Sequence, residues 1–285
     1  MSEINLARQA TLQQRLEPRV LRVLSWAFTG FLVLYILIPV LITLVMSFNN
    51  AAMIRFPITD WSVRWYADFF GSTQWMDALI NSIVIALGTT AISTTAGILA
   101  AWAFERYQIP FRTFWYMLIM MPLFMPGVVL GLGVAIAFGG VQLGSYSFYG
   151  SRELVMIAHS LWAMPLVFML MEATFRTVDY RVVEASYDLG GRPIGSFFEI
   201  VVPMVSTGII SSALFAFVIS LNEFVMALFL TDRDTQTLPV LMWLSLRSAG
   251  TPRLAVASVI LALTVFVCMS VIMLWYARQL RKVAR

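Results

Sequence analysis

Long apolar stretches separated by short charged segments constrain this chain more than any other feature. A helix needs about 20 mainly apolar residues to cross the hydrocarbon core of a bilayer. Backbone groups in lipid must also bond within their own segment, which favours helices. We therefore predict an all-α polytopic membrane protein with six transmembrane helices. The predicted spans are Val23–Ser47, Ala78–Phe104, Thr113–Gly139, Leu154–Glu172 (the marginal one), Met204–Leu230 and Leu254–Ala277.

The composition agrees with a membrane protein and excludes several kinds of site. The 285 residues are 60% hydrophobic and 12% charged, and the mean hydropathy is +0.84. The single cysteine, Cys268, rules out an internal disulfide and a cysteine-based metal cluster. Because Cys268 lies in an apolar run, we expect it to act as a small buried hydrophobic residue. A P-loop ends in Lys-Ser/Thr, and the only lysine is Lys282 near the end of the chain. We predict no catalytic residue, no metal site and no cofactor in this chain.

The distribution of basic residues predicts the orientation. With residues 1–22 in the cytoplasm and the first span an uncleaved signal anchor, 13 of the 19 basic residues are cytoplasmic and 6 external. This asymmetry is the one that the positive-inside rule describes, and it explains the arginines better than a nucleic-acid partner does. We expect both termini in the cytoplasm, an external segment 48–77, a core domain 78–277 that holds the other five spans, and a basic tail 278–285. The cytoplasmic group is Arg8, Arg15, Arg19, Arg22, Arg106, Arg112, Arg176, Arg181, Arg192, Arg278, Arg281, Lys282 and Arg285, and the external group is Arg55, Arg64, Arg152, Arg233, Arg247 and Arg253.

The first external segment carries a cluster of aromatic residues. Thr59-Asp60 predicts a helix cap, with a short helix continuing through Phe70. Aromatic side chains favour the headgroup region, which indicates a helix lying on the outer surface. Two roles stay open for it: an anchor in the interface, or a docking surface for another protein outside the membrane.

The second and third spans are rich in small and helix-breaking residues. Thr89, Ser93 and Gly97 in the second span permit close helix packing, as does Gly127-x-x-x-Gly131 in the third. Pro122 and Pro126 predict a bent or interrupted helix, whose freed carbonyl groups need partners. Tight packing and a place beside a transport pathway are both compatible with this pattern.

Polar groups within the apolar spans are costly in lipid and therefore mark candidate sites. Ser220, Asn222 and Glu223 lie toward the outer end of the fifth span, where Ser220 and Glu223 share one helical face. They are candidates for the substrate pathway, and the alternative is that Glu223 is solvated at the outer boundary. The only histidine, His159 in the fourth span, suits a hydrogen-bonded packing role better than a proton relay.

The segment 177–203 between the fourth and fifth spans mixes charge, glycine and proline. Arg181–Leu189 has helical spacing, with Val182, Ala185 and Leu189 on one face, and Glu184 and Asp188 on the other. Gly190-Gly191 predicts the end of this helix. Pro193 then starts a second short helix, and Pro203 opens the next span. The pattern predicts a helix–turn–helix elbow outside the membrane.

This elbow resembles the EAA motif of binding-protein-dependent ABC importer permeases, which have the MetI-like fold. The matching residues are Glu184-Ala185-Ser186, Gly190 after three residues, and Ile200-Val201-Val202-Pro203 after nine more. Ser186 replaces an alanine of the family pattern and Val202 replaces a leucine. The resemblance implies that Glu184, Ala185, Ser186, Asp188, Gly190 and Pro203 belong to a coupling element that contacts a cytoplasmic ATPase. An amphipathic connector packed on its own protein is the alternative.

Looser patterns extend the resemblance to the spermidine/putrescine branch of these permeases. They are the aromatic external helix, Asn81-Ser82 and Thr237-Leu238-Pro239. The resemblance implies a multi-pass protein of the bacterial inner membrane that works with an ABC ATPase dimer, a second permease subunit in a heterodimer and a periplasmic solute-binding protein. ATP would be bound by the partner subunits, and the solute would be a polyamine or a related cationic compound. We expect Glu223→Gln to reduce uptake of cationic solutes more than of neutral ones.

Other function classes explain the sequence less well. An importer for an opine, an amino acid-like or another small solute would show the same motifs. A self-contained ion-coupled carrier needs several titratable groups within the membrane, and His159 and Glu223 are few for that purpose. An intramembrane enzyme would need a nucleophile and a base in a recognisable motif, which the sequence lacks.

Overall fold

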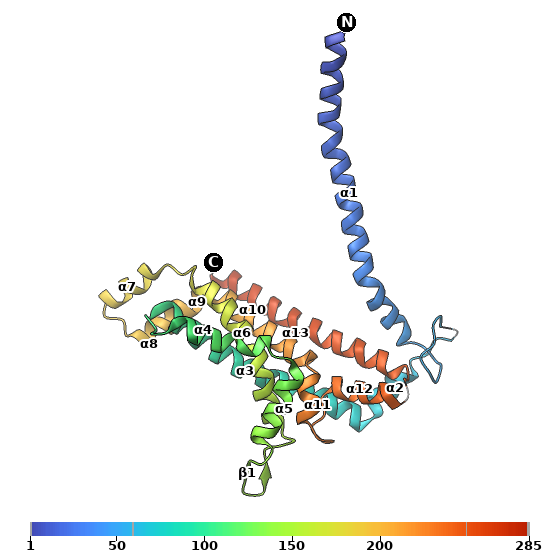
Figure 1. Cartoon of the computed structure of the whole chain (residues 1–285), viewed down its shortest axis with the longest axis vertical. Coiled ribbons are helices and arrows are strands. Elements are labelled where there is room, and N and C mark those ends of the chain that lie inside the picture. The colour runs from blue at the N-terminus through green and yellow to red at the C-terminus, as the bar shows by residue number, and fades with distance from the viewer. Residues whose placement is uncertain (1, 59, 249, 284–285) are drawn as a thin grey trace.

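The computed structural model describes residues 2–58, 60–248 and 250–283, and these are mostly helical (Figure 1). A two-stranded antiparallel hairpin of β1 (Gln142–Leu143) and β2 (Tyr146–Ser147) pairs Gln142 with Ser147. The helices in chain order are α1 (Ser2–Met46), α2 (Arg64–Gly71), α3 (Thr73–Arg106), α4 (Arg112–Met120), the 3-10 turn η1 (Met121–Phe124), α5 (Gly127–Phe138), α6 (Arg152–Phe175), α7 (Tyr180–Asp188), α8 (Pro193–Ser196), the π-helical turn η2 (Phe197–Val201), α9 (Val202–Met204), α10 (Ser206–Asn222), α11 (Val225–Leu230), α12 (Leu238–Ser248) and α13 (Arg253–Val283).

Helices α3, α6 and α10 form the centre of the bundle. A Cβ atom added at Gly97 of α3 would lie 2.5 Å from Cγ1 of Val167 in α6, so these backbones approach closely. Thr89 of α3 donates to the Met156 carbonyl of α6 at 3.3 Å, and both Thr89 and Ser93 are buried. The prediction of close packing through small residues in the second span is confirmed.

In the part of the chain that the structure describes, four helices are long and apolar enough to cross a membrane without interruption: Leu21–Met46, Thr73–Arg106, Arg152–Phe175 and Arg253–Leu274. Two bent pairs raise the number of candidate spans to six if each pair counts as one span. The marginal fourth span is a full 24-residue helix, longer at both ends than predicted. Helix α1 also extends beyond its predicted span, because residues from Ser2 onward belong to the same helix.

The predicted interruption of the third span is confirmed. Helices α4 and α5 meet at an angle of 104° around Pro122 and Pro126. The indole nitrogen of Trp162 in α6 donates to the Pro122 carbonyl at 2.9 Å, so this carbonyl has a partner within the protein. The two glycines of the Gly127-x-x-x-Gly131 pattern pack inside the chain, against Trp162 and Met226. These contacts explain the pattern without a second copy of the protein.

The fifth span differs from its prediction as a single helix Met204–Leu230. Helix α10 begins at Ser206, 76° away from the direction of the preceding helical segment, so Pro203 lies in α9 rather than opening the span. The helix ends at Asn222, because Glu223 is extended (ψ 125°), and α11 follows from Val225. The predicted continuous helical face from Ser220 to Glu223 is therefore wrong.

Helix α2, in the segment predicted to be external, begins later than predicted. Thr59 lies outside the described residues, and the helix starts at Arg64 without a side-chain cap, so the predicted cap at Thr59-Asp60 is wrong. The backbone of Asp60 instead pairs with Asn50. Trp65 and Phe69 are buried in the protein, and Asp68 forms an ion pair with Arg253 of α13. Helix α2 is thus held by the fold, although Phe70 remains exposed.

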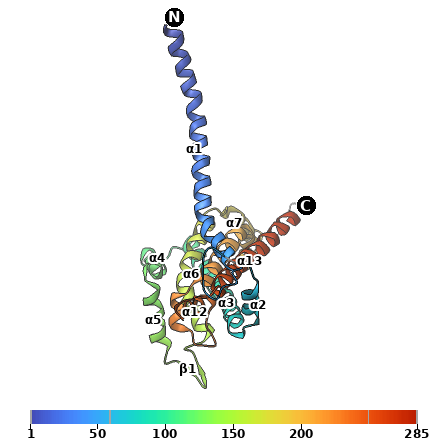
Figure 2. The same cartoon turned by 90° about the vertical axis from the view of Figure 1, so that its right-hand side faces the viewer.

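Helix α1 stands apart from the rest of the chain. Figures 1 and 2 both show it extending away from the bundle. Its apolar segment Leu21–Met46 has the highest exposure of the uninterrupted candidate spans, with none of its most apolar window buried. Its C-terminal part contacts α13, and Pro39 and Thr43 line a shallow apolar groove there with Ser258. Such an exposed apolar surface suits lipid or another membrane subunit.

Candidate functional site

The elbow between α6 and α10 has the local structure that its sequence predicts. The Asp179 side chain caps α7 by accepting from the Arg181 amide at 3.1 Å. Gly190 has a positive φ of +87° and its amide donates to Tyr187, and the Gly191 amide donates to Ser186 at 2.8 Å. This pair of bonds is a Schellman motif, which satisfies the last carbonyl groups of a helix.

The two arms of the elbow are joined directly. Ser186, one of the two residues that depart from the family pattern, lies within hydrogen-bond distance of Ser196 in α8, with 2.8 Å between the hydroxyl oxygens. A Cβ atom at Gly191 would lie 2.4 Å from Oγ of Ser186 and 2.9 Å from Oγ of Ser196. Gly191 therefore permits the close approach of the two serines.

The outer face of the elbow is exposed and partly apolar. Leu189 is 90% exposed and Ile194 75% exposed, and Val182 is also exposed. Glu184, Ala185 and Asp188 lie exposed on α7, as does Pro203 on α9, whereas Val183 is the buried residue of α7. The face predicted as apolar is therefore not packed on this chain, which disfavours a connector packed on its own protein. Exposed apolar residues on a short charged helix suit contact with another protein.

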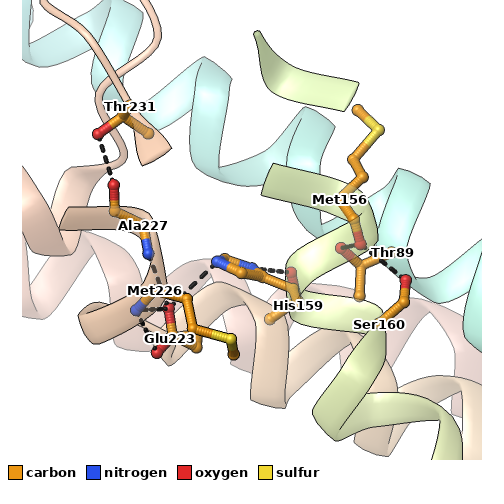
Figure 3. Close-up of polar contacts among 9 residues, drawn as sticks. Thr89, Met156, His159, Ser160, Glu223, Met226, Ala227 and Thr231 are labelled. Carbon is orange, nitrogen blue, oxygen red and sulfur yellow. Dashed lines mark hydrogen bonds and ion pairs between the residues drawn. The ribbon is translucent and has the colours of Figure 1, made fainter. Parts of the chain in front are cut away.

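The second candidate site lies within the membrane part of the bundle, where α10 ends (Figure 3). Nε2 of His159 in α6 lies 3.2 Å from Oε2 of Glu223, close enough for an imidazole–carboxylate pair but not aligned as a hydrogen bond. Nδ1 of His159 lies 2.8 Å from the Ser220 hydroxyl. All three residues are buried, so the alternative of a solvated Glu223 is wrong.

The Glu223 carboxylate also caps the helix that follows it. It accepts from the Met226 amide at 3.0 Å and from the Ala227 amide at 3.2 Å (Figure 3). The first amide groups of a helix lack partners within the helix, and a carboxylate at this end is favourable. The Glu223 carboxylate thus accepts from the first amide groups of α11 and also contacts His159 of α6. In this arrangement His159 has one hydrogen-bonding partner, Ser220, and packs beside the Glu223 carboxylate, which agrees with the packing role that the sequence favours.

The predicted pathway residues differ in their accessibility. Asn222 is exposed and borders an apolar groove of about 560 Å³ between α1, α12 and α13. Ser220 and Glu223 are enclosed beside His159. Among the described residues, no group of three or more His, Cys, Asp or Glu side chains is placed to hold a metal ion.

Sequence reasoning missed an aromatic cluster that attaches the elbow to the bundle. Trp102 of α3 contacts Phe175 of α6, Tyr180 of α7 and Phe197 of η2. Apart from Phe175 and Tyr180, these residues are far apart in the sequence, and the only signal for them is that each lies near the end of a segment that the basic residues predict to be cytoplasmic.

Comparisons with known proteins agree with the fold and the elbow. Residues 93–285 match the family model described as the binding-protein-dependent transport system inner membrane component. The putrescine transport system permease protein PotI of Escherichia coli K12 is 30% identical over 236 residues, covering 81% of this chain and 83% of PotI. The spermidine/putrescine permease PotC of the same strain is 24% identical, covering 85% of this chain and 90% of PotC.

A solved structure shows the same fold. A chain of a bacterial ABC transporter that imports the acidic polysaccharide alginate aligns with a TM-score of 0.70 at 15% identity, covering 90% of this chain and 93% of that one. The family match spans more than half of this protein, including the elbow and both residues of the buried His159–Glu223 pair. The chain therefore belongs to the binding-protein-dependent transport system inner membrane component family, and it is a permease subunit of an ABC importer rather than an enzyme.

Proposed function

We propose that this chain forms half of a translocation pathway and receives mechanical work from a cytoplasmic ATPase through the α7–α8 elbow. The exposed apolar face with Leu189 and Ile194 carries this proposal, because both side chains remain largely exposed to solvent in the folded chain. A short helix docking in a groove of a partner is a recurrent mode of recognition. Glu184, Ala185, Ser186, Asp188 and Gly190 would form the docking helix and its end, and Pro203 the return to the membrane.

The proposed topology has six spans with both termini in the cytoplasm. The elbow and the C-terminal end of α13 lie at the same end of the bundle, whereas α2 and α12 lie at the other (Figure 1). The excess of basic residues assigns the elbow end to the cytoplasm. The protein would then lie in the bacterial inner membrane with residues 48–77 on the periplasmic side.

This topology predicts from which side the elbow can be labelled. In a Cys268→Ser background, Leu189→Cys should react with an impermeant thiol reagent only in inside-out vesicles, because Leu189 is 90% exposed on the elbow. Trp61→Cys, which replaces an exposed residue near α2, is the matched control and should react only in right-side-out vesicles. Labelling of Leu189→Cys from the outside would contradict the docking role.

The proposed assembly includes partners that supply energy and solute. The sequence offers no P-loop, so ATP would be bound by an ATPase dimer. The family description supports a binding protein that delivers solute from the periplasm. The exposed α1 and the exposed side of α4 leave room for a second permease subunit, which we propose is a different chain.

A polyamine is the proposed solute class. The relatives PotI and PotC are permeases for putrescine and spermidine/putrescine, and they cover most of this chain. We assign Asn222 to the pathway wall, with Ser220 and Glu223 supporting it from behind. The amide nitrogen of Asn222 donates to the Val218 carbonyl at 2.8 Å, so the amide oxygen is available to accept from an ammonium group. An opine or amino acid-like solute is the alternative within the same family.

Reconstitution tests the function directly. The chain would be assembled with a second permease and an ATPase pair in nanodiscs. ATP hydrolysis should rise when a putrescine- or spermidine-loaded binding protein is added, and stay low with the unloaded protein. Accumulation of solute against a gradient by the purified chain alone would instead identify an ion-coupled carrier and overturn the proposal.

A further inference from the structure

Both arms of the elbow meet the bundle at one side chain, Trp102 near the inner end of α3. The indole ring lies 5.0 Å from the ring of Phe197 in η2 and 6.1 Å from Tyr180 at the start of α7, measured between centroids. A third ring, Phe175 at the end of α6, lies 5.4 Å away. Tilted aromatic pairs at such distances are favourable beyond their apolar burial.

The residues around Trp102 are themselves held in place. Phe175 is fully buried. The Tyr180 hydroxyl donates to the Phe175 carbonyl at 3.2 Å, and the Arg106 guanidinium lies 5.8 Å from the Tyr180 ring. Burial raises the pKa of Tyr180 to about 12, which moves its deprotonation still farther above neutral pH. The elbow is therefore attached to α3 and α6 through ordered rings.

The outer end of α3 has a second attachment. The Asn81 amide nitrogen donates to the carbonyl groups of Asp234 and Gln236 at 2.9 and 3.0 Å. The Ser82 hydroxyl accepts from the Leu238 amide at 2.7 Å, where α12 begins. The two loose sequence patterns, Asn81-Ser82 and Thr237-Leu238-Pro239, thus contact each other in the fold.

The segment held by Asn81 and Ser82 faces the outside. It borders a polar cavity of about 610 Å³ that is lined by charged residues of both signs, including Asp77, Arg152, Arg233 and Asp234. In the proposed topology this cavity lies on the side from which a binding protein approaches. Movement of residues 231–237 would reach α3 through three hydrogen bonds with buried side chains.

Both attachments lie on α3, which is one uninterrupted helix of 34 residues. The stretch from Asn81 to Trp102 is about 32 Å long at 1.5 Å per residue. Its packing against α6 is tight at Gly97, where a Cβ atom would lie 2.5 Å from Val167. Chains of packed side chains joined by rigid helices are the physical means by which distant sites become coupled.

We infer that α3 is the rigid link between the external segment 231–237 and the cytoplasmic elbow, with Trp102 as its inner positioning residue and Asn81 and Ser82 as its outer ones. The inference rests on the proposed function, since it names the route by which docking outside reaches the ATPase contact inside. Loss of either attachment should leave the elbow in contact with the ATPase. Docking of the binding protein outside should then no longer stimulate ATP hydrolysis fully.

The test compares Trp102→Ala with Phe104→Ala in the reconstituted complex. Phe104 lies on the same helix and is buried, whereas Trp102 is half-buried, and the ring contacts of Phe104 are to Tyr116 and Phe168, within the bundle. Both variants should lower the melting temperature. Trp102→Ala should reduce stimulation of ATP hydrolysis by the loaded binding protein by about fivefold with basal hydrolysis retained, whereas Phe104→Ala should keep the wild-type stimulation ratio.

Milder variants complete the test. Trp102→Phe, which keeps an aromatic ring, should restore most of the stimulation, and Ser82→Ala should reduce it without changing the elbow. If the complex with Trp102→Ala does not assemble, the ratio of stimulated to basal ATP hydrolysis in Trp102→Phe and Ser82→Ala tests the inference instead. Normal stimulation in Trp102→Ala, or equal loss in Phe104→Ala, would overturn the inference. If the wild-type complex itself shows no stimulation, the proposed function fails instead.

Discussion

Replacement of Gly190 by valine is expected to abolish most solute uptake while the protein still inserts in the membrane. Gly190 has φ +87°, which a β-branched residue adopts only with strain. Holding valine there costs about 1–3 kcal/mol. The amide bonds from Gly190 and Gly191 that end α7 would then be lost in favour of a relaxed turn. Because the membrane spans are not involved, we expect uptake to fall about tenfold or more at a normal level of inserted protein.

Gly195→Val is the matched control for Gly190→Val. A Cβ atom at either glycine meets no atom within 4 Å, so the two substitutions differ in backbone conformation and not in available space. Gly195 lies in α8 without a positive φ, and valine is tolerated there at little cost. Uptake assays and quantified membrane fractions measure both variants. Normal import by Gly190→Val would show that the end of α7 has no part in coupling.

The elbow could be predicted from sequence because its structure is local. Gly190, Pro193 and the helical spacing before them determine where α7 ends and where α8 begins, within a few residues of chain. The interruption at Pro122 and Pro126 was predictable for the same reason, since proline acts on its own helix. What the sequence left open there was the partner of the freed carbonyl, which is Trp162 of another helix.

The interruption at Glu223 could not be predicted from the local sequence. The run from Ser206 to Leu230 contains no proline and only one glycine, Gly208, near its start, so its composition favours one continuous helix. The chain is extended at Glu223, where one carboxylate caps α11 and also reaches His159 of another helix. Such a break depends on tertiary contacts. The Trp102 cluster was missed for the same reason, because its rings come from four separate elements.

Of the single substitutions at the buried His159–Glu223 pair, replacement of Glu223 by alanine is expected to cause the largest loss of stability. The change leaves His159 without its carboxylate partner and removes the acceptor for the Met226 and Ala227 amides. Removing one member of a buried pair costs about 3–5 kcal/mol, since the remaining groups stay buried without compensation. Thermal inactivation of the purified protein in detergent measures the loss, and α11 should become more accessible to proteases.

Asn222→Ala and Glu223→Gln separate a structural role of Glu223 from contact with solute. Asn222 is adjacent but exposed, so its replacement should change stability by no more than about 0.5 kcal/mol. Glutamine keeps a carbonyl oxygen for the α11 amides, and the stability loss should be about 1–3 kcal/mol. The sequence alone predicts that Glu223→Gln reduces uptake of cationic solutes more than of neutral ones. Because Glu223 is enclosed by His159 and α11, the structure changes this expectation to an equal reduction for both. A selective loss of cationic uptake in competition assays would instead place the carboxylate in contact with the solute, and the pair with His159 would then have to open during transport.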